Sequence, residues 1–126
     1  MQKISKENSS IRIEDSLEFL DSAKDNLLKS RFKATIDHSI TACIAANDAF
    51  TISLLGKIAN MSHYEAIDLH QDAALSLKEN KKFLLKELLN ERHKITYRPI
   101  KATECMAKLN LKKANEFIAW IRQNIH

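Results

Sequence analysis

The stretch "FKATIDHSITACIAANDAFTISLLGKI", residues 32 to 58, decides the fold class of this chain. Apolar side chains occur around nearly its whole circumference when it is drawn as a helix, and a helix of that kind lies in the centre of a bundle. Residues 41 to 50 are rich in small side chains, which allow neighbouring helices to approach closely. We therefore expect one central helix that is surrounded by others.

The rest of the chain also favours helices. Its 126 residues include one glycine and one proline, so nearly every position is compatible with a helix interior. Apolar residues recur at helical spacing in four further segments, namely 13 to 29, 63 to 77, 81 to 96 and 103 to 124. The sequence predicts an all-α protein, an antiparallel bundle of about five helices. This domain is expected to span residues 13 to 126, after a flexible N-terminal segment of residues 1 to 12.

Polar and special residues indicate where these helices begin and end. Gly56 weakens the end of the central helix, and Ser62 followed by Glu65 is a capping box for the next one. Asn80 is the expected N-cap of the fourth helix, and Pro99 ends it. The expected buried positions of the fourth helix are Phe83, Leu84, Leu88 and Ile95.

Several classes of protein are excluded by what the sequence lacks. No stretch approaches the roughly 20 apolar residues that cross a bilayer, and "MQKISKENSSIRIEDS" has no apolar signal segment, so we expect a cytoplasmic protein without membrane contact. His63 and His70 are too far apart on one helix to hold an ion without a third element, so we expect no metal. The single glycine excludes a glycine-rich phosphate loop, and we expect no cofactor.

Positive charge is concentrated near the end of the fourth helix. Residues 81 to 101 contain seven cations and two anions, a net charge of +5, in a chain whose total is +4. A local positive field attracts polyanions. One interpretation is a phosphate- or RNA-binding segment that uses Arg92, Lys94 and Arg98. The other is a lysine-rich helix face in contact with solvent only.

Asn47 and Asp48 lie within the central helix, where an unpaired carboxylate would cost several kcal/mol. Both side chains must therefore have partners. One interpretation is a polar network in the core that fixes the register of the helices, and the other is that Asp48 supports a binding site. Arg92 continues the apolar face of the fourth helix, and we expect it to be the partner of Asp48.

Three segments carry a resemblance to a known family. They are "AANDAFTISLLG" in the central helix, "SHYEA" after it and "RHKITY" before the proline. In this order and spacing, over about residues 15 to 122, the chain resembles the HEPN superfamily (higher eukaryote and prokaryote nucleotide-binding domains), and in particular its small prokaryotic members. The resemblance implies a homodimeric bundle of four to five antiparallel helices that acts in a toxin-antitoxin or defence setting.

The same resemblance identifies candidate catalytic residues. Catalytic HEPN proteins are metal-independent endoribonucleases in which an arginine holds the scissile phosphate, and a histidine separated from it by four to six residues assists attack by the ribose 2′-hydroxyl. Arg92 matches the arginine, but Tyr97 stands where the histidine is expected. A tyrosine, with an ordinary pKa near 10, is a poor base at neutral pH. His93 is a further catalytic candidate. The expected supporting polar residues are Asn47, Asp48 and His63.

We therefore expect a module that binds RNA or a nucleotide with little or no catalysis. Two alternatives stay open. The first is a metal-independent endoribonuclease toxin that uses Arg92 and Tyr97, and the second is a structural or partner-binding dimer without nucleic-acid activity. The resemblance also implies an antitoxin or a nucleotidyltransferase as a protein partner.

Overall fold

The computed structural model describes residues 2 to 60 and 62 to 125, with the backbone alone for Gln2. Met1, Met61 and His126 lie outside the described residues. Met1 belongs to the predicted flexible segment of residues 1 to 12, and the other two belong to the predicted domain of residues 13 to 126.

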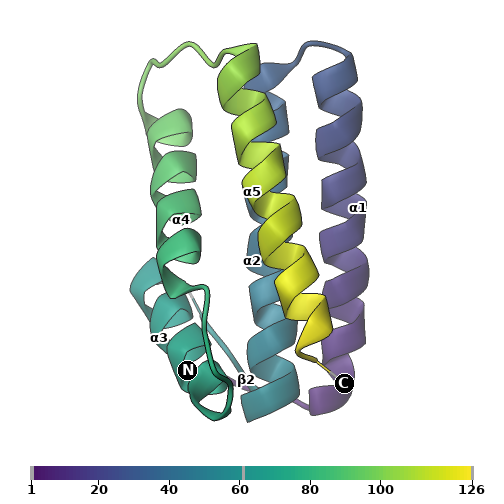
Figure 1. Cartoon of the computed structure of the whole chain (residues 1–126), viewed down its shortest axis with the longest axis vertical. Helices are drawn as coiled ribbons and strands as arrows, with labels where there is room; N and C mark the ends of the chain where they lie inside the picture. The colour runs from purple at the N-terminus through teal and green to yellow at the C-terminus, as the bar shows by residue number, and fades with distance from the viewer. Residues whose placement is uncertain (1, 61, 126) are drawn as a thin grey trace.

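Five α-helices make up most of the part of the chain that the structure describes. They are α1 (Ser9–Leu28), α2 (Phe32–Leu55), α3 (His63–Ala73), α4 (Lys82–Tyr97) and α5 (Glu104–Gln123). The helices α1, α2, α4 and α5 run along the long axis, and the short α3 lies beside the lower part of α4 (Figure 1). Since α2 contacts each of the other four helices, the predicted all-α bundle with this helix at its centre is confirmed.

The first residues are held against the end of α2. The short strand β1 (Gln2–Lys3) pairs antiparallel with β2 (Lys57–Ile58), and a 3-10 turn (Lys6–Asn8) leads into α1. Residues 9 to 12, expected in the flexible segment, instead form the first turn of α1. Arg12 on this turn binds a side chain of α2, and that contact extends the helix beyond the apolar pattern from which its start was predicted.

The helix α2 ends at Leu55, before the predicted end at Ile58. Gly56 adopts the left-handed conformation with φ of 64°, and its N–H bonds to the carbonyl of Ile52 at 2.8 Å. A residue in this conformation cannot continue a right-handed helix. The chain therefore leaves α2 here and enters β2.

We expect Gly56→Ala to lower the free energy of unfolding by about 1 kcal/mol, because a Cβ is strained at positive φ. Steric overlap adds little, since the nearest atom to such a Cβ would be the Ile4 oxygen at 3.5 Å. Ser30 has φ of 58°, so Ser30→Gly is expected to raise stability by a similar amount. Urea denaturation measures both changes, and two variants that shift in the same direction would contradict this explanation.

One apolar face of α5 is buried, and it packs in the core together with Phe117 and Trp120; its other members are Ala107, Leu111, Ala114, Ile118 and Ile121. The prediction that Phe83 is buried is wrong, because its side chain is 76% exposed, and Leu28, an apolar residue of the predicted first helix, is 84% exposed. In α4 the core is formed from Leu85 onward, and Phe83, two residues earlier, lies about 200° around the helix from Leu85. Leu28 is the last residue of α1, and Leu27 packs against the core in its place.

Candidate functional site

The buried carboxylate of Asp48 pairs with Arg12 of α1. Its Oδ2 lies 2.9 Å from Arg12 Nη2, and Arg12 Nη1 lies 2.8 Å from Asp15 Oδ2. Burial raises the pKa of Asp48, and the contact with Arg12 opposes that rise. The predicted pairing of Asp48 with Arg92 is therefore wrong.

Arg92 of α4 pairs instead with Asp37, whose Oδ1 lies 3.2 Å from Arg92 Nε. The direction of the helices explains the difference, because α2 and α4 run antiparallel (Figure 1). Asp37 and Asp48 are eleven residues apart in α2, which corresponds to roughly 16 Å along the helix axis. The C-terminal part of α4 therefore lies beside Asp37.

Asn47 belongs to a buried network around His70. The backbone N–H of Lys81 donates to His70 Nε2 at 2.9 Å, so that nitrogen carries no proton. Nδ1 is then the protonated nitrogen, and it donates to Asn47 Oδ1 at 2.9 Å, while Asn47 Nδ2 donates to the carbonyl of Ala66 at 3.3 Å. Burial lowers the pKa of His70 to about 4. Asn47 thus links α2 to α3 within the core, as the first of the two interpretations predicted.

The start of α3 is fixed by its cap. Ser62 Oγ accepts hydrogen bonds from the backbone N–H groups of Tyr64 at 3.2 Å and Glu65 at 3.5 Å. The predicted role of Ser62 as the N-cap is confirmed. This cap holds the first turn of α3, which carries His63 and Tyr64, beside α4.

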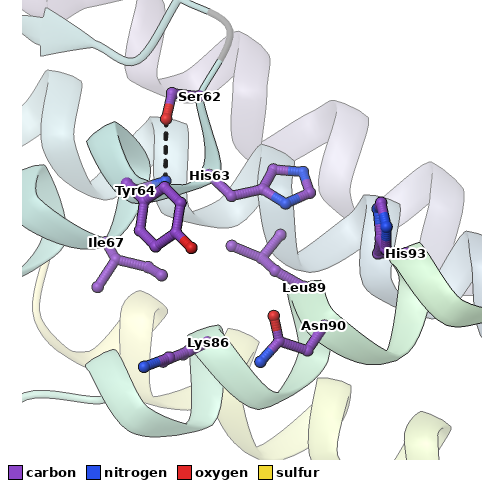
Figure 2. Close-up of a pocket in the computed structure, with 8 residues that line it drawn as sticks. All are labelled: Ser62, His63, Tyr64, Ile67, Lys86, Leu89, Asn90 and His93. Carbon is purple, nitrogen blue, oxygen red and sulfur yellow. Dashed lines mark hydrogen bonds between the residues drawn. The ribbon is translucent and has the colours of Figure 1, made fainter.

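A cavity of about 490 Å³ lies between α3 and α4. Its lining residues are Ser62, His63, Tyr64, Ile67, Lys86, Leu89, Asn90 and His93. Figure 2 shows His63 and His93 toward one end, with Lys86 toward the other. The volume lies within the range of about 300 to 1,000 Å³ that is typical of small-molecule sites.

Arg92 and His93 lie near His63 at one end of this cavity. Burial lowers the pKa of His63, and so do the charges of Arg92 and His93, which disfavour a further positive charge nearby. Tyr97, at the end of α4, packs its exposed ring against His93 with 4.8 Å between ring centroids. The structure therefore brings together four of the predicted site residues from α3 and α4.

The other predicted residues lie elsewhere. Asn47 and Asp48 are buried in networks of α2 that do not line this cavity. Lys94 is exposed about 200° around α4 from Arg92, and Arg98 follows the end of the helix. We therefore assign no role in this cavity to these four residues.

Six lining residues were not singled out as site residues from the sequence; besides the cap Ser62 and the apolar Ile67 and Leu89, they are Tyr64, Lys86 and Asn90. Lys86, Asn90 and His93 are spaced by four and then three residues, which places them on one face of α4. This polar stripe is visible in the sequence. It lines a cavity only because α3 lies beside it in the folded chain.

For residues 2 to 60 and 62 to 125, the structure also shows what is absent. No group of three or more histidine, cysteine, aspartate or glutamate side chains there is arranged to hold a metal ion. Within the same ranges, no helix has the length and apolar character needed to cross a membrane. No protein-family model matches the sequence, and no curated protein matches it either.

Proposed function

We propose that this chain is an HEPN-like module that binds RNA through the cavity between α3 and α4 without cleaving it. The observation that carries the proposal is the cavity itself, where His63, Lys86 and His93 line one space and Arg92 lies near its histidine end. The order of the sequence motifs, which resembles the HEPN superfamily, supports RNA or a nucleotide as the ligand. Tyr97 in place of the motif histidine supports binding over cleavage.

The chemistry of the cavity suits a phosphodiester chain. Lys86 lines the cavity and Arg92 lies near its histidine end, and protonated histidines donate charge-assisted hydrogen bonds to phosphate oxygens. Lys86 and His93 are exposed, so a backbone phosphate can reach them without any change in the core. Neutralising phosphates releases counterions, which makes the affinity depend strongly on salt.

Fluorescence anisotropy with a labelled single-stranded RNA tests the proposal. We expect binding at low salt that weakens as salt rises, with a slope of about −0.7 for each neutralised phosphate. Lys86→Ala should weaken binding and reduce the slope, whereas Lys24→Ala, an exposed lysine on α1, serves as the matched control. Absence of binding at low salt, or equal losses in the two variants, would remove the proposal.

The affinity for RNA is expected to rise as the pH falls from 8 to 6. The pKa of His63 is lowered in the free protein, and a bound phosphate would raise it, so RNA binding takes up a proton. A rise of one pKa unit corresponds to about tenfold in affinity. Anisotropy titrations at several pH values measure this. His63→Gln should show a flatter profile, and an unchanged pH dependence in that variant would contradict the assignment.

Homodimerisation and a protein partner, either an antitoxin or a nucleotidyltransferase, belong to the same proposal. Their support is the resemblance to the HEPN superfamily. Sedimentation velocity of the purified chain tests the dimer, which should persist at micromolar concentration. A monomer at that concentration would restrict the proposal to a single chain that binds RNA alone.

The two histidines favour a second candidate function, a metal-independent endoribonuclease. His63 and His93 lie toward the same end of the cavity, with Arg92 near enough to act on His63. The lowered pKa keeps His63 neutral near pH 7, which is the form of a general base. Incubation with end-labelled RNA in the presence of a chelator tests this candidate. Uncut RNA removes it, whereas cutting that is lost in both His63→Ala and Arg92→Ala would favour it over binding alone.

A further inference from the structure

Two hollows lie side by side along the interface of α3 and α4. The second has a volume of about 260 Å³, and it shares Tyr64, Ile67 and Lys86 with the larger cavity. Phe83 lines this second hollow only. The two hollows therefore form one continuous groove, with Lys86 in its middle.

An exposed aromatic ring accompanies each hollow. Tyr64 is 77% exposed and Phe83 is 76% exposed, although large aromatic rings are usually well buried. Figure 2 shows the Tyr64 ring projecting from α3 over the larger cavity. The Lys82 ammonium lies 5.2 Å from the centroid of the Phe83 ring. Aromatic rings with cations between them are the arrangement on which unpaired bases stack.

The larger cavity also offers a group that can hydrogen-bond a base edge. The Asn90 amide is exposed and makes no side-chain hydrogen bond within residues 2 to 60 and 62 to 125. Ile67 and Leu89 provide apolar contacts beside it. An amide can both donate and accept at one base edge, as the side chains of asparagine and glutamine do with adenine.

We propose that this groove binds two consecutive unpaired nucleotides of an RNA strand. One base stacks on Tyr64 with its edge toward Asn90, the next base stacks on Phe83, and the phosphate between them lies at Lys86. This inference rests on the proposed function and deepens it, because it selects single-stranded RNA over a duplex. Bases paired in a duplex are stacked on each other and are not available to the two rings.

The test compares substitutions at the two rings with one at a matched position. Leu75 is 76% exposed and lines neither hollow, so Leu75→Ala removes a similar exposed apolar side chain outside the groove. Tyr64→Phe retains the ring and removes only the hydroxyl. All of these side chains are exposed, so each variant should melt like the parent chain, which circular dichroism checks before binding is measured.

The probe is a labelled single-stranded octamer of adenylate, compared with a labelled RNA duplex whose stem of G–C pairs stays folded at low salt. Tyr64→Ala and Phe83→Ala should each weaken binding to the free strand by roughly 5- to 150-fold, the range of a lost base stack. Leu75→Ala and Tyr64→Phe should bind within about twofold of the parent. The parent chain should also prefer the free strand to the duplex.

The outcomes separate this inference from the proposed function. If the aromatic variants bind like the parent while Lys86→Ala binds weakly, the groove contacts phosphates only, and the stacking proposal is overturned while RNA binding stands. Equal affinity for the free strand and the duplex overturns it as well. If the parent chain binds neither RNA at low salt, the proposed function itself fails.

Discussion

His70→Ala is expected to lower the free energy of unfolding by about 3 kcal/mol. The substitution leaves a cavity beside the Phe50 ring, whose centroid lies 5.1 Å from that of His70, and it removes both hydrogen bonds of the imidazole. Asn47 Oδ1 and the Lys81 N–H would lose their shared partner. Urea denaturation at pH 7 measures the loss. His38→Ala is the control, since His38 is only half-buried and bonds to Ser22 at 2.7 Å, and its effect should be smaller.

His70 also makes the free energy of unfolding depend on pH. The pKa of His70 is about 4 in the folded chain, whereas that of an unfolded histidine is about 6.5. Between these values the unfolded state binds more protons, so His70 contributes stability above pH 6.5 that is lost as the pH falls toward 4, up to about 3 kcal/mol. The difference between the curves of the parent and His70→Ala isolates this effect, because Asp48, whose pKa is raised, is present in both. Parallel curves would contradict the buried neutral state of His70.

Arg12→Ala is expected to lower stability by about 2 kcal/mol, because it leaves the Asp48 carboxylate buried without its partner. The loss lies below the 3 to 5 kcal/mol that is typical of a fully buried pair. The side chains of Arg12 and Asp48 are 30% and 12% exposed, so water screens part of the charge. Asp48→Asn in the Arg12→Ala background should recover part of the loss.

Arg92→Ala is the matched control for this pair, since it removes an arginine that also pairs with a residue of α2. Asp37, its partner, has a side chain that is 39% exposed, so the loss should stay within about 1 kcal/mol. Thermal or urea denaturation at neutral pH measures the loss of stability in each variant. A larger loss for Arg92→Ala than for Arg12→Ala would contradict the pairing of Arg12 with Asp48.

Much of the fold could be predicted from local patterns. The apolar circumference of residues 32 to 55 identified the central helix, and the Ser62 cap located the start of α3. The pairing of Asp48 could not be predicted in this way. The pairing depends on which part of α1 and of α4 lies beside Asp48 in the folded bundle. An arginine at position 12 or 92 does not by itself specify that arrangement.

The candidate site was predicted only in part, for a related reason. Arg92, His93 and Tyr97 were recognised because they lie in one segment of α4, and His63 because it follows the central helix. The groove itself consists of residues of α3 and α4 that come together through the loop between these helices. Phe83 is 76% exposed although its helical spacing predicts a core position, because a phenylalanine at such spacing is usually buried.

NMR mapping shows whether RNA binds in the groove between α3 and α4. An unlabelled single-stranded RNA is titrated into ¹⁵N-labelled protein at low salt, and the backbone amide shifts are followed. We expect the shifts to gather in residues 62 to 71 of α3 and its cap and in residues 82 to 93 of α4, the two segments that line the groove. Shifts confined to α1 and α5, or none at saturating RNA, would contradict this expectation.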